Sequence, residues 1–358
     1  MEIKVTKDSL ASAVGTALKA VPVKTSVPIM ECILFTVAND EVRLTSNNGE
    51  IGVDTYLSNA EIKEDGSVCV DAKTLSAIVS KLPDGEVTLK VDDSTMLIKS
   101  GKSKFKIATK DGSEFPNIDA IPHDNQILLS QDVLKEVIKQ TAFSASVAES
   151  NKMMTGVLFD ISDNLKVVAL DGHRIAMREI TLDKSFEPAK LIIPSKTLQE
   201  IAKLLSEGDV ELYYTNNQIA FSFDNTVLVS RLIEGNFFDV NKMINDTHTT
   251  EVKVDRLELL NCVDRATLLV KEIDRKPVLF TIDNHIKVEI ATQLGSMDED
   301  IEADVTGNEL KIGLNPRFLI DVLRILDDDK VTILFNGEAQ PCYIKGDNYL
   351  YLILPIKF

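Results

Sequence analysis

The sequence contains no tryptophan and only four histidines, which limits the metal chemistry open to it. Its four cysteines are scattered and form neither a Cys-x-x-Cys pair nor a group with histidine: Cys32, Cys69, Cys262 and Cys342. This spacing argues against a zinc site and against a disulfide framework. We therefore expect no metal, no cofactor and a reducing, cytoplasmic location.

Long apolar runs are also absent. No segment approaches the roughly 20 apolar residues that span a bilayer, and the chain starts in an alternating strand pattern without the apolar stretch of a signal peptide. Hydrophobic residues make up 44% of the 358 residues and charged residues 27%. This composition is typical of a folded, soluble protein of two or three domains, with no membrane contact.

Motifs of catalytic sites are missing as well. The sequence has no Walker-type loop, dinucleotide fingerprint, His-Glu-x-x-His or Gly-x-Ser-x-Gly element. Asp171 lies close to His173, but Asp-Gly between two apolar runs is more simply a hairpin turn, with His173 and Arg174 as surface donors. The acidic run 298–304 lacks the glycine pattern of an EF-hand. We expect no catalytic residues and no enzyme.

The sequence does contain an internal repeat. A short alternating strand, a polar cap and an amphipathic helix occur in this order in three segments: 3–10, 127–134 and 252–257. Leu10, Leu134 and Leu257 hold the equivalent position in these segments and are 124 and 123 residues apart. Repeats of this length are whole domains, so the spacing predicts three copies of one domain.

A second set of strand-cap-helix segments lies midway between the first: 68–75, 192–198 and 312–319. Leu75, Leu198 and Leu319 are 123 and 121 residues apart, so the repeating unit is a half-domain used six times. The sequence predicts an α+β fold of three repeated domains, each with two helices packed on antiparallel sheets. We place these domains at residues 1–120, 121–244 and 245–358.

Caps and turns agree with this plan. Asp71, Ser195 and Asn315 are suitable N-caps for the second-set helices, and Pro316 follows at the first helical position. Three turns are expected to supply the positive φ angles of tight hairpins: Asn47-Asn48-Gly49, Asp171-Gly172 and Asn216-Asn217.

Basic residues recur on the second-set helices, although the net charge is −17 and the pI about 4.8. Lys73, Lys196 and Arg317 occupy equivalent positions, and Lys203 and Arg324 follow their partners by seven residues on the same helical face. A solvated helix face explains any one of them. Their recurrence favours a second interpretation, in which the helices line the hole of a ring and meet DNA phosphates.

Two strands carry opposite charge. Residues 102–110 are basic, whereas residues 297–305 in the third repeat are acidic. Complementary edge strands can pair head to tail, and such a contact closes into a ring when the rotation allows. Two unrelated solvated strands would give the same pattern, so charge alone leaves both possibilities open.

Several phrases resemble the bacterial DNA polymerase III β subunit family, the sliding clamps. They are Leu170-Asp171-Gly172-His173-Arg174-Ile175-Ala176, Lys24 with Pro28-Ile29-Met30, Asn315-Pro316-Arg317-Phe318-Leu319, and Tyr351-Leu352-Ile353-Leu354-Pro355-Ile356-Lys357-Phe358. The resemblance runs from the first repeat to the last residue. It implies a head-to-tail homodimer, a six-domain ring around duplex DNA, and a groove in which polymerase, clamp loader and repair proteins dock linear peptides.

Three sets of residues follow as candidates. The DNA-facing set is Lys24, Lys73, Lys152, Lys196, Lys203, Arg317 and Arg324. The peptide-groove set is Met154, Thr155, Gly156, Leu170, Gly172, His173, Arg174, Ile175, Asn245, Pro341, Leu352, Leu354, Pro355, Ile356, Lys357 and Phe358. The dimer-interface set is Lys102, Lys104, Lys106, Leu268, Leu269, Glu299, Asp300 and Glu302.

The sequence departs from the family pattern at three places. Asn245 stands where many relatives have a proline, Phe358 ends the chain where leucine is common, and the loop 149–153 lacks the arginine and tyrosines that some relatives place near DNA. The main alternative is a repeat-built interaction scaffold that does not encircle DNA. Size in solution distinguishes the two, because a clamp has to be a stable dimer.

Overall fold

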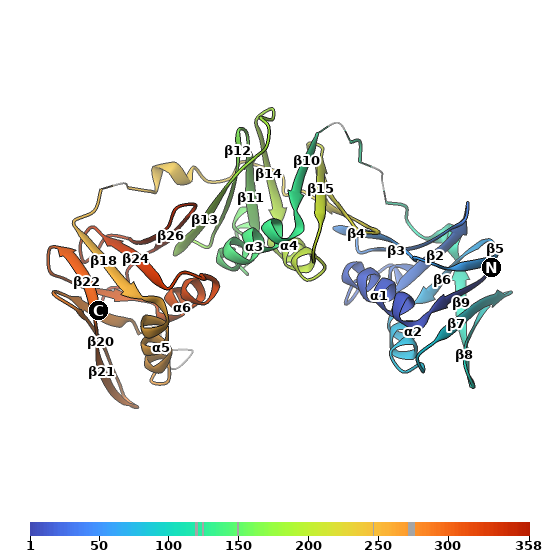
Figure 1. Ribbon diagram of the computed structural model, residues 1–358, viewed down its shortest axis with the longest axis horizontal. Coiled ribbons are helices and arrows are strands. Elements are labelled where there is room, and N and C mark those ends of the chain that lie inside the picture. The colour runs from blue at the N-terminus through green and yellow to red at the C-terminus, as the bar shows by residue number, and fades with distance from the viewer. Residues whose placement is uncertain (119–120, 124, 149, 246, 271–275) are drawn as a thin grey trace. The chain divides into compact units, whose positions relative to one another are not determined.

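The computed structural model describes residues 1–118, 121–123, 125–148, 150–245, 247–270 and 276–358. They form two compact units, one of residues 1–135 with 200–232 and one of residues 136–199 with 233–358. Each unit therefore holds one terminal repeat and part of the middle repeat (Figure 1). Residues 119, 120 and 246, next to the expected domain boundaries, lie outside the described residues, and the limits 1–120, 121–244 and 245–358 stay a prediction.

The first unit begins with the first repeat, in which η denotes a short 3-10 helix. Its elements are β1 (Glu2–Thr6), α1 (Lys7–Ala17), η1 (Leu18–Ala20), η2 (Pro28–Glu31), β2 (Cys32–Ala38), β3 (Glu41–Asn47), β4 (Ile51–Tyr56), β5 (Glu61–Glu64), β6 (Gly66–Asp71), α2 (Ala72–Val79), β7 (Glu86–Asp92), β8 (Thr95–Ser100), β9 (Ser103–Asp111) and η3 (Gly112–Glu114). Helices α1 and α2 contact each other and pack on these strands (Figure 1).

Strands of the middle repeat extend the same sheet. They are β10 (Gln126–Ser130), β15 (Asp209–Tyr214), β16 (Gln218–Phe223) and β17 (Thr226–Arg231). Strand β17 pairs antiparallel with β4, and the result is a 13-stranded sheet that runs through both repeats. The Thr55 and Thr226 hydroxyls hydrogen-bond across this seam at 3.0 Å. Backbone ladders therefore join the first repeat to the middle one.

The second unit has the corresponding plan. Its part of the middle repeat contains η4 (Ala142–Ser144), η5 (Lys152–Thr155), β11 (Gly156–Ile161), β12 (Asn164–Leu170), β13 (Arg174–Thr181), β14 (Ala189–Pro194) and η6 (Val240–Lys242). The third repeat contains β18 (Thr250–Asp255), α5 (Arg256–Thr267), β19 (Val278–Ile282), β20 (Ile286–Thr292), β21 (Gly295–Ile301), β22 (Ala303–Gly307), β23 (Leu310–Leu314), α6 (Pro316–Ile325), β24 (Lys330–Phe335), β25 (Cys342–Lys345) and β26 (Tyr349–Ile353). Helices α3 (Gln131–Thr141) and α4 (Ser195–Ala202) contribute residues to both units.

Two sheets make up the second unit. Strand β13 of the middle repeat pairs antiparallel with β26 of the third, which gives a nine-stranded sheet. A separate four-stranded sheet has the order β21-β20-β19-β23. Helices α5 and α6 contact each other beside the strands of the third repeat (Figure 1). Their buried residues form one apolar core with residues of both sheets.

The predicted repeat is visible in a recurring backbone hydrogen bond. The first residue of each first-set helix donates its N–H to the loop after the second-set helix: Lys7 to Gly85 at 2.9 Å, Gln131 to Gly208 at 2.8 Å and Arg256 to Asp329 at 2.9 Å. In the first two repeats the acceptor is a glycine with positive φ, +120° and +106°. The α+β fold of three repeats with antiparallel sheets is thus confirmed.

The turns were only partly as expected. Gly49 and Gly172 do adopt positive φ, at +88° and +87°. The prediction was wrong for Asn216-Asn217, where neither residue has positive φ and the Thr215 hydroxyl accepts the N–H groups of Asn217 and Gln218 instead. Asp71 and Asn315 cap their helices as expected, because their side chains accept from Thr74 N at 2.8 Å and from Arg317 N at 3.0 Å. Ser195, the third predicted cap, is instead the first residue of α4.

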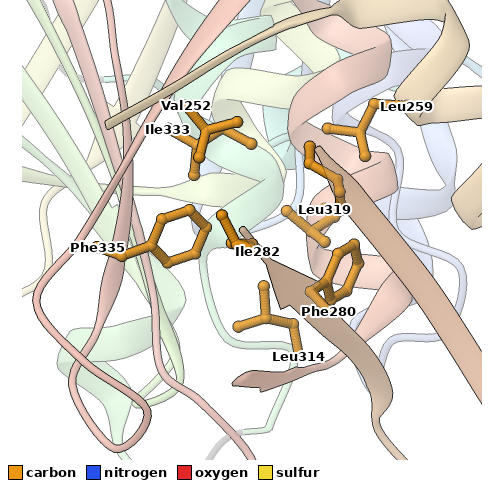
Figure 2. A pocket seen from close by; sticks show the side chains of 9 residues that line it. Val252, Leu259, Phe280, Ile282, Leu314, Leu319, Ile333 and Phe335 are labelled. Carbon is orange, nitrogen blue, oxygen red and sulfur yellow. The ribbon is translucent and has the colours of Figure 1, made fainter. Parts of the chain in front are cut away.

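The core of the third repeat encloses a void of about 10 Å³ (Figure 2). Only apolar side chains line it, among them Phe280, Leu319 and Phe335. A space of this size is at the lower limit for one water molecule, and it offers a water no polar partner. We interpret it as a packing gap that binds no ligand.

Candidate functional site

All seven predicted DNA-facing side chains are exposed, but they differ in their partners. Lys203 pairs with Glu200 at 2.6 Å, and Arg324 pairs with Asp264 at 2.9 Å. Partial burial of Glu200 opposes ionisation, but the hydrogen bond from Lys203 and the charges of Lys203 and Lys19 keep its pKa below the usual value. Part of the positive charge at Lys203 and Arg324 is therefore neutralised locally.

Four of the candidate lysines are not paired with a carboxylate of the described residues. Lys24 lies in the loop after η1, Lys73 in α2, Lys152 in η5 and Lys196 in α4. None of them has an ion pair with any residue that the structure describes. An exposed ammonium on a flexible stem can contact phosphate oxygens without reading base edges.

The predicted peptide groove is built around the hairpin between β12 and β13. Gly172 takes the left-handed conformation in its turn. One carboxylate oxygen of Asp171 accepts the backbone N–H groups of His173 at 3.0 Å and Arg174 at 3.2 Å. The Asp-Gly motif therefore folds the turn, as the sequence indicated, and leaves the His173 side chain exposed.

The interpretation of Arg174 as a surface donor is wrong. Its side chain is only 11% exposed. The guanidinium donates to Asp171 at 3.0 Å, to Asp321 of α6 at 2.6 Å and to the Phe143 carbonyl at 2.9 Å. It also lies over the rings of Phe143 and Phe318, 5.2 and 4.6 Å from their centroids. Arg174 thus fixes the hairpin of the middle repeat to a helix of the third.

The C-terminal tail is held at both ends. Leu354 donates its N–H to the His173 carbonyl at 2.9 Å, and Ile356 donates to the Gly313 carbonyl at 2.8 Å. Gly313 lies in β23, the edge strand of the four-stranded sheet, so the tail links the two sheets of the second unit. A Cβ at Gly313 would lie 2.6 Å from the Ile356 carbonyl oxygen, which explains the need for glycine here.

An apolar cluster lies beside this hairpin and contains several predicted groove residues. Leu170, Ile175 and Leu352 are buried in it, and Met154 packs partly against it. Gly156 has no room for a side chain, because a Cβ would come within 2.5 Å of Ile192. These five residues thus lie in or beside this cluster, and their role in a peptide groove stays a prediction.

The remaining predicted groove residues lie nearer the surface. Leu354, Lys357, Phe358 and Asn245 are exposed, and Thr155, Pro341, Pro355 and Ile356 are half-buried. The Asn245 N–H donates to the Tyr343 hydroxyl at 3.2 Å, and Tyr343 belongs to the apolar cluster. Sequence reasoning missed Tyr343, and it missed Phe143 and Asp321 as partners of Arg174, because no local motif marks them.

A cavity of about 210 Å³ opens next to this cluster. The apolar side chains of Leu158, Phe237 and Phe238 line part of it. The Asp160–Lys190 ion pair, at 3.3 Å, lies on its polar side. The cavity has room for one side chain of a bound peptide.

The basic strand β9 has a free edge. Residues 103–108 pair with β8 on one side, whereas only residues 109–111 pair with β6 on the other. Lys104 lies directly opposite Lys99, a like-charge pair that is unfavourable in an isolated sheet. Lys102, Lys104 and Lys106 are exposed and have no ion pair among the described residues. Phe105, on the opposite face of β9, is 38% exposed.

The acidic strand β21 is also an edge, because within the described part of the chain it pairs with β20 alone. Asp298 and Asp300 point to its exposed face, and Glu302 follows the strand, also exposed. Glu299 points to the other face, where Arg265 of α5 donates to it at 3.0 Å and lowers its pKa. Glu299 thus has an ion-pair partner within its own chain, and its place in the dimer interface stays a prediction. Leu268, 79% exposed, and the half-buried Leu269 lie at the end of α5.

No catalytic centre is found among the residues that the structure describes. Within them, no three His, Cys, Asp or Glu side chains are grouped as metal ligands, and no helix is long and apolar enough to cross a membrane. All four cysteines are buried thiols, and burial raises the pKa of Cys69, Cys262 and Cys342 to about 12. A thiol with such a pKa is a poor nucleophile at neutral pH.

The geometry is that of a binding protein built from repeats, with charged sheet edges and an apolar cluster at a seam. Comparison with protein families agrees: the N-terminal, central and C-terminal domains of the DNA polymerase III beta subunit match residues 1–119, 128–239 and 241–357. The chain belongs to this family of bacterial sliding clamps. It is accordingly a non-catalytic subunit of the replication machinery.

Individual relatives cover the whole chain. The beta sliding clamp of Staphylococcus epidermidis is 32% identical, with 100% of this chain and 99% of the relative aligned. A putative DNA polymerase III beta subunit from Eubacterium rectale has a crystal structure with a TM-score of 0.96 and 43% identity, covering 100% of both chains. The DNA polymerase sliding clamp of Bacillus subtilis has a TM-score of 0.96 and 30% identity, covering 100% of this chain and 99% of that one.

Replacing Arg174 tests its structural role. Arg174→Met keeps much of the side-chain length but leaves Asp171 and Asp321 without their partner, so we expect the second unit to lose about 2–3 kcal/mol of unfolding free energy. Thermal unfolding and amide exchange of residues 171–174 measure this. The control His173→Ala removes an exposed ring and should change stability by less than about 0.5 kcal/mol. If Arg174→Met and His173→Ala had the same unfolding free energy, the structural role assigned to Arg174 would be contradicted.

Proposed function

We propose that two copies of this chain close head to tail into a ring around duplex DNA and tether the replicative polymerase and other DNA-metabolism proteins. The observation that supports the ring most directly is the pair of free sheet edges with opposite charge, β9 and β21. A heterologous contact of this kind generates a closed ring when the rotation fits. We place the clamp domains at 1–120, 121–244 and 245–358, and the protein in the cytoplasm, associated with the nucleoid during replication.

The two edges are complementary on both faces. On the exposed face, Lys104 and Lys106 of one copy would meet Asp298 and Asp300 of the other. On the opposite face, Phe105 would be covered by apolar groups such as Leu268 and Leu269. Pairing would also relieve the repulsion of Lys104 with Lys99, and that of Asp298 with Glu289 directly opposite it. Lys102 and Glu302 would lie at the margins of this contact.

A charge swap tests the interface. Lys104→Glu should raise the dimer dissociation constant roughly 10-fold, because like charges would then face each other across the interface. Adding Asp298→Lys should restore much of the loss. Sedimentation at a series of concentrations measures both variants, with Lys63→Glu on exposed β5 as the control. A Lys104→Glu profile like that of the parent, or a double variant no better than the single one, would reject this pairing.

Contact with DNA would be electrostatic and independent of sequence. Lys24, Lys73, Lys152 and Lys196 carry the strongest part of this proposal, because their charge is not neutralised by a described neighbour. Lys203, Arg317 and Arg324 would add weaker contacts. An open protein with so few phosphate contacts would dissociate readily in salt, whereas a closed ring is retained by its topology.

Retention on DNA tests both parts of the proposal. After loading by the cognate clamp loader, the protein should stay on closed circular DNA at high salt and leave linear DNA by sliding off its ends. Lys73→Glu with Lys196→Glu should reduce the loaded amount several-fold, since two phosphate contacts become repulsive. The control pair Lys63→Glu with Lys253→Glu changes exposed strand residues by the same charge. Equal loss of the parent from circular and linear DNA would contradict encirclement.

Partner peptides would dock at the apolar cluster beside the Asp171-Gly172 hairpin. Leu170, Ile175, Leu352, Met154 and Gly156 would form the floor of the groove, and Arg174 would support its wall from behind. The sides would be formed by the more exposed candidates: Thr155, Gly172, His173, Asn245, Pro341, Leu354, Pro355, Ile356, Lys357 and Phe358. An extended peptide with aliphatic and aromatic anchors suits such a surface.

Shortening the tail tests the groove. Deleting residues 354–358 removes both backbone hydrogen bonds of the tail and should weaken binding of a labelled polymerase-derived peptide at least 10-fold, with the dimer unchanged. Fluorescence anisotropy gives the affinity and sedimentation gives the mass. Lys357→Ala alone is the matched control and should change the affinity much less. Full peptide binding by the truncated protein would place the groove elsewhere.

A further inference from the structure

Among the residues of the second unit that the structure describes, three polar atoms are buried without a hydrogen-bond partner: Gln140 Oε1, Arg178 Nε and Tyr351 Oη. They belong to α3, β13 and β26, which meet at the seam between the middle and third repeats. Such atoms are rare in folded proteins, and each costs free energy unless water satisfies it. Three of them in one neighbourhood require an explanation.

Arg178 is the common neighbour of the other two side chains. Ala176 of β13 lies opposite Tyr351 of β26, and Arg178 lies opposite Tyr349, so Arg178 and Tyr351 are diagonal neighbours on one face of the sheet. Glu136 connects Arg178 to Gln140, because one of its carboxylate oxygens accepts from Arg178 Nη2 at 3.4 Å and from Gln140 Nε2 at 2.9 Å.

The chemistry of these atoms is complementary. Arg178 Nε–H is a donor, Gln140 Oε1 is an acceptor, and the Tyr351 hydroxyl can do both. The Gln140 amide cannot be reversed without turning its oxygen toward the Glu136 carboxylate, so its acceptor stays unpartnered. Burial raises the pKa of Tyr351 above its usual range, which keeps the hydroxyl protonated.

We propose that this cluster is a binding site for buried water, held by Gln140, Arg178 and Tyr351 at the β13–β26 seam. A single water could accept from Arg178 Nε and from the Tyr351 hydroxyl and donate to Gln140 Oε1. The water then completes the polar network that ties α3 to the seam. Tyr349 is not part of the site, because its hydroxyl already bonds to Asp328 at 3.0 Å.

Removing the Tyr351 hydroxyl distinguishes a site that binds water from a site that does not. If water binds there, Tyr351→Phe takes away one of its partners, and the melting temperature should fall by about 1–3 °C. If the hydroxyl has no partner, its removal relieves an unfavourable burial and the melting temperature should stay equal or rise. Tyr214→Phe, at a buried tyrosine outside this cluster, is the control and should leave the melting temperature unchanged.

A crystal structure of the full chain, at a resolution that shows ordered water, provides the independent measurement. We expect density within hydrogen-bonding distance of all three atoms, and its loss or displacement in Tyr351→Phe and Gln140→Met. A dry site in the parent would overturn the proposal. So would a direct bond from the Tyr351 hydroxyl to Gln140, or a Tyr351→Phe variant at least as stable as the parent.

Discussion

The structure depends on strand pairing that crosses from one repeat to the next. Strand β17 pairs with β4 in the first unit, and β13 pairs with β26 in the second. Backbone ladders of this kind are directional, and their register is fixed by which face of each strand is buried. The 13-stranded and nine-stranded sheets are therefore each completed by strands from two repeats, whereas the four-stranded sheet lies wholly within the third repeat. The edges left over include the basic half of β9 and the acidic β21, which carry opposite charge.

The second seam also carries the proposed docking site for partner peptides. The hairpin that precedes β13 emerges directly at the seam, and the tail that follows β26 returns to it through Leu354 and His173. Arg174 is the first residue of β13, and its guanidinium reaches Asp321 of α6 and the Phe143 carbonyl. In this ion pair the Arg174 side chain is 11% exposed and that of Asp321 is 42% exposed, so the pair is only partly buried, and the directional hydrogen bonds of the guanidinium fix the geometry of the seam. The apolar cluster keeps its shape because the two repeats are fixed by both the ladder and this arginine.

Sequence reasoning predicted the features that are encoded locally. The threefold repeat, the second-set helices, the caps at Asp71 and Asn315 and the Asp171-Gly172 turn all depend on residues close together in the chain. It failed where a partner is distant: Asp321 is 147 residues from Arg174, and Arg265 is 34 residues from Glu299. It also missed the turn at Asn39 and Asp40, which have φ of 52° and 61°, because asparagine and aspartate tolerate this conformation only at some sites. A charge pattern in the sequence shows which residues are charged. It does not show which of these charges are neutralised by an ion pair in the folded protein.

The difference between the total charge and the local charge explains how an acidic chain can have DNA as a partner. The net charge of −17 describes the whole surface, and salt screens exposed charges beyond about 8 Å. In the proposed DNA-facing set, Lys73 and Lys196 have no ion pair among the described residues, whereas Lys203 and Arg324 are paired with carboxylates. Weak contacts are compatible with sliding, because a protein that binds every phosphate tightly could not move along DNA. In the proposed ring, partial neutralisation of the basic set within the fold would leave enough attraction to centre the duplex, and the topology of the ring would supply the retention.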